Sequence, residues 1–298
     1  MHVLGVWAGR FSVVRRHFSK GVLTIAIVVL VLGVAITWGV YSLLKRATPL
    51  AQGAHCKIAT PQGDLEMDVD QAVVAATIAA VAERRRLPER AVVIAYATGI
   101  QESKLLNIPF GDRDSVGVFQ QRPSMGWGTQ KQLLDVVYST DKFFEGLVKV
   151  KNYQRIPLHI AAQEVQRSAD GSLYAQHEND AKIMAAAFTG RVPAALQCWT
   201  PPPKDESKVK KPRVEAASRE LRRALGDTPV SGDKITASST RRGWLVAAWS
   251  VAHARDYGLR GVRYDGRAWA ADAGFEGWQE DDGATTRHVI LNRPAPAA

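Results

Sequence analysis

Charged residues are absent from residues 21–44 of this 298-residue chain, a run that reads GVLTIAIVVLVLGVAITWGVYSLL. This absence argues against a segment that lies in water, and about 20 apolar residues are enough for a helix to cross a membrane. The run therefore predicts one N-terminal transmembrane helix over residues 21–44. A buried core helix is one alternative. A cleaved signal peptide is another, although its apolar part typically has only about 7–15 residues.

Acidic residues are absent from the segment that precedes this run, residues 1–20. Its basic residues are Arg10, Arg15, Arg16 and Lys20. Only Lys45 and Arg46 follow the run directly, and the more basic flank of a span usually stays inside the cell. The sequence thus predicts a single-pass protein of the cell membrane, with residues 1–20 as a cytoplasmic arm and the chain after about residue 45 extracellular.

Cysteine is scarce, since Cys56 and Cys198 are the only two in the chain. They lie at either end of the segment between them, and thiols outside the cell are prone to oxidation. We therefore expect a disulfide between them, and closing a loop of this length would contribute about 4–5 kcal/mol. The alternative is two unrelated buried thiols.

No nucleic-acid-binding motif accompanies the net charge of +10. The basic residues are scattered along the chain, and the basic runs at residues 83–90, 208–213 and 219–223 are each typical of a solvated helix face or a linker. Outside the cell a basic surface would meet anionic wall polymers or lipid head groups. We therefore expect no nucleic acid among the partners.

Convincing strand alternation is also absent between residues 68 and 198, where the apolar spacing predicts helices. The first helix starts at Asp68, and the second runs from Pro88 to Ser103 and is apolar on nearly every side, as expected of a helix buried inside a domain. Further helical patterns cover residues 129–138, 139–150, 156–168 and 173–188. These patterns predict a mostly helical domain over residues 68–199, preceded by a polar, turn-rich stalk over residues 45–67.

Prolines and charges dominate residues 200–214, TPPPKDESKVKKPRV, and predict a linker. After the linker, helical patterns at residues 215–225 and 243–257 are joined by strand-like patterns at residues 259–266 and 285–291. Residues 215–298 are therefore predicted to form a small α+β domain.

One carboxylate, Glu102, lies at the C-terminal end of the second predicted helix. Its neighbours at helical spacing are Ala95, Thr98 and Gly99, so no local counter-ion is expected. Burial and the negative end of the helix dipole both favour the protonated carboxyl. A carboxyl that holds a proton near neutral pH can act as a general acid, as cleavage of a glycosidic bond requires. The alternative is a helix-terminal glutamate that points into water.

Glu102-Ser103 and the later GVFQ (residues 117–120) resemble the ES…GLMQ signature of soluble lytic transglycosylases, which share the goose-type lysozyme fold. The runs at residues 111–129, 161–168 and 174–178 resemble the lysozyme-like domain of membrane-anchored wall proteins from high-GC Gram-positive bacteria. The similarity covers roughly residues 56–198. It implies a lysozyme-like fold and peptidoglycan glycan strands as the substrate, while a protein partner stays unknown.

The resemblance implies particular roles for a few residues. Glu102 matches the catalytic acid/base, Ser103 and Gln120 match positions that shape the glycan cleft, and Tyr174 is a candidate for an aromatic that approaches the carboxyl from a later helix. The family's AYNAG element is only faintly matched by AAFTG at residues 186–190. Two more carboxylates, at positions 112 and 114, are more simply interpreted as turn formers.

A lone carboxylate must first protonate the leaving oxygen and then act as base, and the resemblance implies attack by the substrate's own C6 hydroxyl, giving a 1,6-anhydromuramic product. No metal or cofactor is expected, since His177-Glu178 has no partners that would complete a metal site. A module of the same fold that binds peptidoglycan and positions a partner complex, without catalysis, is the competing hypothesis.

Residues 244–269 and 287–291 resemble the C-terminal half of a zinc DD-peptidase-like wall domain. In that family an HVHV strand supplies metal ligands, but here Ile290 stands where the second histidine is expected. His288 alone cannot hold a catalytic zinc ion. We therefore expect a degenerate, metal-free unit that binds or spaces rather than cuts.

Overall fold

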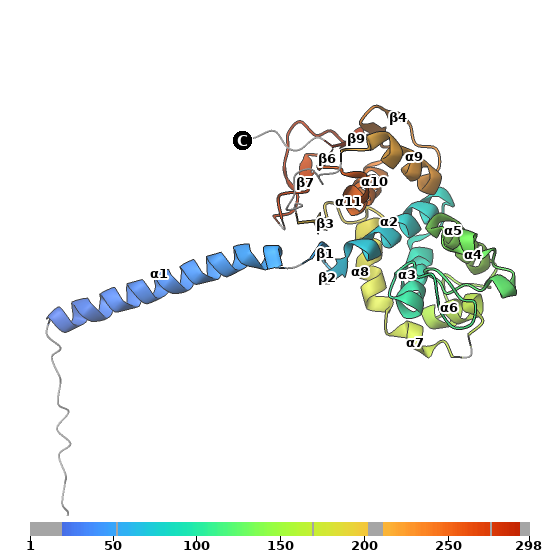
Figure 1. Cartoon of the computed structure of the whole chain (residues 1–298), viewed down its shortest axis with the longest axis horizontal. Coiled ribbons are helices and arrows are strands. Elements are labelled where there is room, and N and C mark those ends of the chain that lie inside the picture. Colours follow the sequence, from blue (N-terminus) through green and yellow to red (C-terminus); the bar gives the residue numbers. More distant parts are fainter. Residues whose placement is uncertain (1–19, 52, 169, 202–210, 275, 293–298) are drawn as a thin grey trace, which may run out of the picture. The chain divides into compact units, whose positions relative to one another are not determined.

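The computed structural model describes residues 20–51, 53–168, 170–201, 211–274 and 276–292 (Figure 1). The chain divides into two compact units, residues 1–51 and 52–298. The first contains helix α1 (Lys20–Ala51), in which the side chains of residues 20, 22, 23, 26 and 41–51 are outside the description. Among the described residues, no helix combines the length and the apolar character needed to cross a membrane. The predicted transmembrane helix is therefore not shown, and the predicted cytoplasmic arm lies outside the described residues except for its last residue.

The second unit is a mixed α+β structure with two antiparallel sheets, and the described chain is about half helical. The expectation of helices together with α+β structure is confirmed only at this coarser level, as a mixed α+β unit, and the predicted division into two domains stays a prediction. The assignment of the helical part to the lysozyme-like fold stays a prediction.

The two long helices of the helical part form where the apolar spacing predicts them. They are α2 (Val69–Arg84) and α3 (Glu89–Ser103). The side chain of Gln71 caps the start of α2 by accepting a 2.8 Å hydrogen bond from the Asp68 N–H, and Pro88 is the N-cap residue of α3. Both helices are buried on most sides, as the sequence predicts.

Shorter helices surround α3. They are α4 (Gln130–Leu133), α5 (Val136–Leu147), α6 (Leu158–Gln166), α7 (Ser172–Ala175) and α8 (Glu178–Phe188), with a 3-10 turn at Pro123–Met125. The predicted helix at 129–138 is broken because Asp135 caps a new helix, its carboxylate accepting from the N–H groups of Val137 and Tyr138. The predicted helix at 173–188 is likewise split into α7 and α8.

A three-stranded sheet in the order β2-β1-β3 was not predicted from the sequence. Its strands are β1 (His55–Thr60), β2 (Gly63–Asp68) and β3 (Leu196–Trp199). Two strands thus lie within the segment interpreted as a stalk, and that interpretation needs correction for residues 55–67. The reason is that β1 buries only Cys56 and Ile58 fully, so its alternation is too short to stand out.

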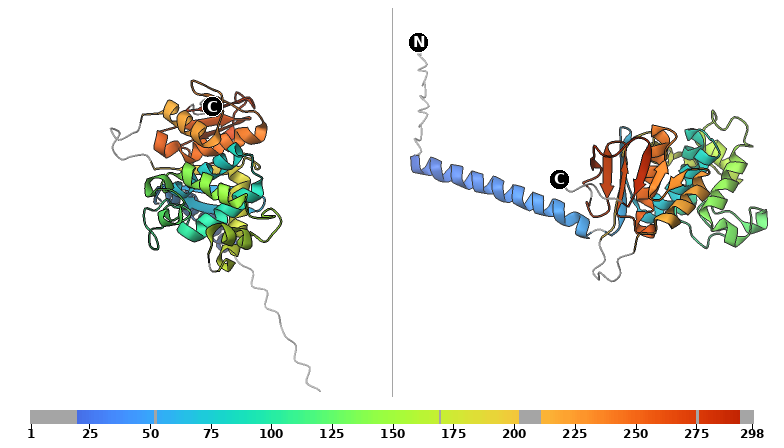
Figure 2. Two further views of the ribbon diagram at one scale, coloured as in Figure 1. Left: turned by 90° about the vertical axis from the view of Figure 1, so that its right-hand side faces the viewer. Right: turned by 90° about the horizontal axis from the view of Figure 1, so that it is seen from above.

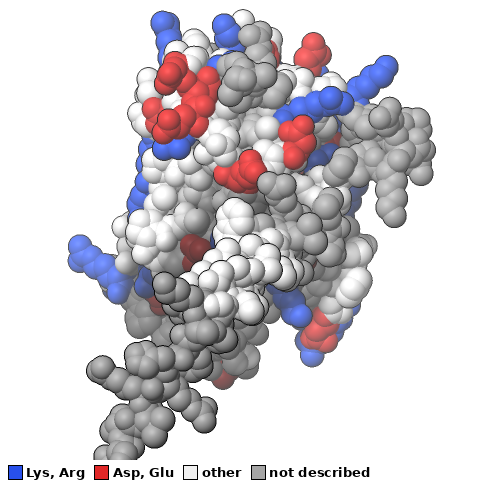
Figure 3. Space-filling model, turned by 90° about the vertical axis from the view of Figure 1, so that its left-hand side faces the viewer, with Lys and Arg blue, Asp and Glu red and all other residues white. Residues whose placement is uncertain are grey.

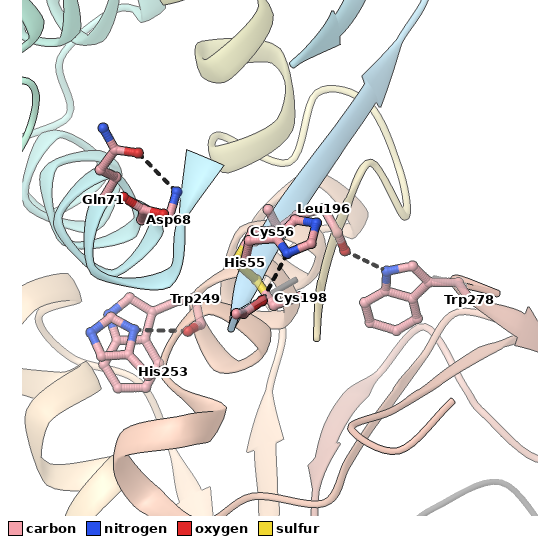
Figure 4. The surroundings of a disulfide bond; sticks show 10 residues. His55, Cys56, Asp68, Gln71, Leu196, Cys198, Trp249, His253 and Trp278 are labelled. Carbon is pink, nitrogen blue, oxygen red and sulfur yellow. Dashed lines mark hydrogen bonds between the residues drawn. A yellow bond between two sulfur atoms is a disulfide. The ribbon is translucent and has the colours of Figure 1, made fainter. Parts of the chain in front are cut away.

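The predicted disulfide between Cys56 and Cys198 is confirmed (Figure 4). The two cysteines are directly opposite each other in the antiparallel pair of β1 and β3, and their sulfur atoms are 2.05 Å apart. Both side chains are buried. The bond therefore joins the two ends of the helical part within one sheet.

A six-stranded antiparallel sheet in the order β4-β5-β9-β6-β7-β8 forms most of the C-terminal part. Its strands are β4 (Val230–Ser231), β5 (Lys234–Thr236), β6 (Gly261–Tyr264), β7 (Arg267–Ala270), β8 (Gln279–Glu280) and β9 (His288–Leu291). The helices are α9 (Val214–Leu225), α10 (Thr240–Ala252) and α11 (Ala254–Tyr257). Helix α10 lies between this sheet and α2, which explains why it is buried on every side (Figure 2).

The C-terminal part packs closely onto the helical part. A Cβ atom built on Gly190 would lie 2.1 Å from the carbonyl oxygen of Arg241, so the loop after α8 touches the backbone of α10 directly. Glu83 at the end of α2 pairs with Arg241 at 2.6 Å and with Arg242 at 3.2 Å. Buried side chains of both parts belong to one hydrophobic cluster. Of the predicted linker, residues 202–210 lie outside the described residues.

Charge of both signs is distributed over the surface. On the face in Figure 3, blue Lys and Arg side chains are interspersed with red Asp and Glu side chains, and small acidic groups lie toward the top.

Candidate functional site

Glu102 lies in the last turn of α3, and its side chain is partly exposed. The helix ends directly after it because Lys104 and Leu105 both adopt the left-handed conformation, with φ values of 56° and 58°. Their N–H groups return to the carbonyl oxygens of Ile100 and Gly99, each at 2.9 Å. These two hydrogen bonds give partners to carbonyl groups at the end of the helix and fix the turn that carries the Glu102 carboxylate.

Two neutral donors reach the same oxygen of Glu102. The hydroxyl of Tyr174, on α7, donates to Oε1 at 2.6 Å, and Nε2 of Gln166, at the end of α6, donates to it at 3.1 Å. Two consecutive helices, α6 and α7, therefore meet the distant helix α3 at one carboxylate oxygen. Neither of these two partners is a cation.

Tyr174 is buried, with 3% of its surface exposed. Burial, and next the hydrogen bond to Glu102, raise the pKa of its phenol well above the ordinary value. The hydroxyl therefore keeps its proton at neutral pH and remains a donor. The structure thus brings together Glu102 and the aromatic residue that the sequence singled out for the approach to it.

Gln166 connects the carboxylate to the GVFQ segment. Its Nε2 donates a second hydrogen bond of 2.7 Å to the carbonyl oxygen of Phe119, whose ring stacks on Phe143 with centroids 4.4 Å apart. Gln166 has no role among the residues predicted from the sequence. The available signal was its position in the run at residues 161–168, which carries part of the family resemblance.

Ser103 and Gln120 hold the loop that follows α3. The Ser103 hydroxyl donates to the carbonyl oxygen of Val118 at 2.8 Å, and the Gln120 amide donates to that of Gly117 at 3.1 Å. Their described hydrogen bonds are to backbone groups, and neither is bonded to Glu102 in the described part of the chain. Their contribution to a glycan cleft stays a prediction.

Asp112 and Asp114 differ in their surroundings. The side chain of Asp112 is 90% exposed, whereas Asp114 accepts 2.8 Å and 2.7 Å hydrogen bonds from Nε of Arg122 and the N–H of Ser124. The Arg122 guanidinium, followed by that N–H, holds the pKa of Asp114 well below its usual range. Asp114 therefore has the bonding of a turn former.

A cavity of about 420 Å³ lies beside the end of α6. It is lined by residues on both sides of Gln166, although Glu102 is not among them. Its wall includes the aromatic Trp127 and charges of both signs: Lys142, Glu145, Lys149, Glu164 and Arg167. Glu145 pairs with both lysines, at 2.8 Å and 3.3 Å. The cavity thus combines an indole with hydrogen-bonding groups next to the residue that positions Glu102.

Within the described residues, no group of three or more His, Cys, Asp or Glu side chains is placed to hold a metal ion. Nε2 of His177 lies 2.9 Å from Oε1 of Gln101, and burial lowers the pKa of this histidine. Glu178 pairs with Arg90 at 2.9 Å. His288, on β9, lies 3.5 Å from the hydroxyl of Thr236.

The AAFTG segment lies at the end of α8 and faces the C-terminal part. Ala186 and Phe188 are buried, and Thr189 donates to the carbonyl oxygen of Ala185 at 2.7 Å. Gly190, with φ of 71°, packs on the backbone of α10. This segment therefore serves the packing of the two parts.

Comparison with known proteins does not assign the chain to a family. No protein-family model matches the chain, and a search of curated proteins finds no relative.

Proposed function

We propose that the helical part is a lysozyme-like domain that cleaves the glycan strands of peptidoglycan, with Glu102 as general acid and then base. The observation that carries the proposal is the convergence of Tyr174 and Gln166 on Oε1 of Glu102. A partly exposed carboxyl that two neutral donors hold in place has a fixed orientation, as a general acid and base requires.

The bonding of the other candidate acid supports a mechanism with one carboxylate. Asp114 is held by Arg122 and Ser124 and has no described contact with Glu102. Glu102 would then protonate the leaving glycosidic oxygen and next accept the proton of the C6 hydroxyl that attacks the anomeric carbon. The product would be a 1,6-anhydromuramic end, as the resemblance to lytic transglycosylases implies.

The cavity beside Gln166 supports a sugar polymer as the ligand. The indole of Trp127 offers an apolar surface to a sugar ring, and the lysine, arginine and glutamate side chains offer hydrogen bonds to hydroxyl, amide and carboxylate groups.

A second candidate function is a module that binds peptidoglycan and positions a partner complex without cleaving the glycan. The observation in its favour is the AAFTG segment, which lacks the polar residue of the family's AYNAG element and packs against α10. A domain that uses this segment for internal packing can keep a binding groove without full catalytic function.

We also propose that residues 21–44 anchor the protein in the cell membrane as a single span, with the second unit outside the cell. The support is the uncharged run together with the described large apolar side chains of α1 between Ile25 and Val40, each half or more exposed. Protease added to intact cells should remove the chain after residue 45. Protection of that chain would contradict the orientation.

Digestion of purified peptidoglycan by the full chain, followed by mass analysis of the products, tests the proposed function. Glycan fragments lighter by one water than hydrolysis products would support a lytic transglycosylase, and hydrolysed fragments would indicate a muramidase. Sedimentation with peptidoglycan but no fragments would favour the binding module. Neither binding nor cleavage would refute both functions.

A further inference from the structure

The two oxygens of the Glu102 carboxylate have different surroundings. Oε1 accepts hydrogen bonds from the hydroxyl of Tyr174 at 2.6 Å and from Nε2 of Gln166 at 3.1 Å, whereas Oε2 accepts none from the described residues. A proton on Oε1 would take up a lone pair that one of these two donors uses. In the neutral carboxyl the proton therefore belongs on Oε2.

Gln166 holds Oε1 as a double donor. Its Nε2 group also donates to the carbonyl oxygen of Phe119 at 2.7 Å, so both N–H bonds of the amide point to oxygen acceptors. Turning the amide over would place its own oxygen against these two oxygens, which excludes the other orientation. Among neutral side chains, only Gln and Asn carry two N–H bonds on one atom, and Asn is one methylene shorter. The residue type at this position thus fits the task of holding Oε1.

The carbonyl group of Phe119 is a fixed point of the fold. Its side chain is fully buried. The N–H of Val116 donates to the carbonyl oxygen of Gln121 and the reverse bond also forms, both at 3.1 Å, so these two bonds close the loop that carries Phe119. Gln166 therefore connects Oε1 of Glu102 to a backbone segment that is itself held in place.

The end of α6 determines where this amide lies. Gln166 is the last residue of the helix, because Arg167 adopts the left-handed conformation with φ of 54°. Leu158 and Val165 are buried, so the helix is packed against the domain by its apolar side. The backbone that carries the Gln166 side chain is thus as well fixed as the Phe119 carbonyl that the side chain reaches.

We propose that Gln166 is a positioning residue that makes Oε2 of Glu102 the atom that gives and takes the proton. The inference rests on the proposed glycan cleavage and adds to it the reacting oxygen. First the Oε2–H bond breaks, and the proton goes to the glycosidic oxygen as the bond of this oxygen to the anomeric carbon breaks. Next the C6 hydroxyl attacks the anomeric carbon and its proton passes to Oε2, which restores the neutral carboxyl. Oε1 keeps its two donors throughout.

Kinetics of peptidoglycan cleavage by the full chain test this role. Gln166→Met keeps the length of the side chain but removes both N–H donors. We expect kcat to fall about 10- to 100-fold while KM stays within about twofold, because the substrate is bound as before but the acid is misplaced. Gln154→Met is the matched control, since that side chain is exposed and has no described hydrogen bond.

The failures of the two proposals differ in these kinetics. An active wild type with an undiminished kcat in Gln166→Met would overturn the inference alone, and so would a raised KM with unchanged kcat. A wild type that does not cleave would refute the proposed cleavage and the inference with it. If Gln166 acts on the same oxygen as Tyr174, the double variant Gln166→Met/Tyr174→Phe should lose more than the product of the two single effects. Independent effects would contradict the shared oxygen.

A second measurement leaves Gln166 unchanged and needs no catalysis. In Glu102→Gln the donors Tyr174 and Gln166 require an oxygen at the Oε1 position, so the new side-chain NH₂ group takes the place of Oε2. Its NMR signals are the pair that the wild-type spectrum lacks, and they should shift when a soluble tetramer of N-acetylglucosamine binds. If they stay in place while other signals shift, Oε2 faces away from the glycan and the inference is wrong. A tetramer that shifts no signal would refute glycan binding, and the inference with it.

Discussion

The hydroxyl of Tyr174 donates a 2.6 Å hydrogen bond to Oε1 of Glu102, although 72 residues separate them in the sequence. Loss of this hydrogen bond should matter more to a reaction that uses the carboxyl than to the fold. The partly exposed carboxyl can be solvated instead.

Tyr174→Phe should lower glycan cleavage about 10- to 100-fold, because the acid loses one of its two positioning donors. The melting temperature should change little. Tyr257→Phe is the matched control, since that ring stacks near Trp249 and its hydroxyl has no described hydrogen bond. Equal rates for all three proteins would show that the Tyr174 contact does not serve catalysis.

The disulfide should contribute about 4–5 kcal/mol to the stability of the second unit, because it closes a loop with a sequence separation of 142. Urea unfolding of the full chain with and without a thiol reductant measures this contribution. The double variant Cys56→Ala/Cys198→Ala should be less stable and insensitive to the reductant. An unfolding midpoint of the wild type that does not move on verified reduction would contradict the prediction.

Close packing at Gly190 predicts a steric cost for any side chain there. Gly190→Ala places a Cβ atom against the carbonyl oxygen of Arg241, whereas Gly232, with a similar positive φ of 61°, has no atom within 4 Å. Gly190→Ala should therefore destabilise the protein by about 1–3 kcal/mol more than Gly232→Ala. Denaturant unfolding of the two variants measures the difference, and equal costs would show that the loop and α10 do not pack as described.

His253 predicts a loss of stability in mild acid. Its ring is 4% exposed and stacked on Trp249, and burial lowers its pKa to about 4. Between this pKa and the value of about 6.5 in the unfolded chain, the unfolded chain binds more protons than the folded chain. The free energy of unfolding therefore decreases as the pH falls through this window, by up to about 3 kcal/mol. The pH dependence of unfolding should be flatter in His253→Phe. An equally steep dependence in that variant would assign the effect to other groups.

The helices could be predicted because their apolar spacing is long and regular, as in α2 and α3. The strands β1 and β2 were missed because each buries few residues and their short polar alternation looks like a turn-rich segment. The packing of Gly190 on Arg241 could not be predicted, since no local pattern reports which surface of a later segment meets an earlier loop.

The residues of the candidate site were likewise only partly predictable from the sequence. Glu102 stood out because a carboxylate ends an apolar helix, and Tyr174 was named through the resemblance. Gln166 was missed because its two hydrogen bonds, to Glu102 and to the carbonyl oxygen of Phe119, depend on how α6 is placed against α3. Spacing along one helix cannot give that placement.

The most direct test of the account compares peptidoglycan cleavage by the wild type with cleavage by Glu102→Gln. Glutamine keeps the volume and still accepts from Tyr174 and Gln166, but it cannot deliver a proton. Cleavage should fall by at least about 10²–10⁴-fold, while sedimentation with peptidoglycan and the melting temperature are retained. The control Glu66→Gln, at an exposed position on β2, should cleave like the wild type. An active wild type whose Glu102→Gln variant cleaves at an undiminished rate would contradict the central claim.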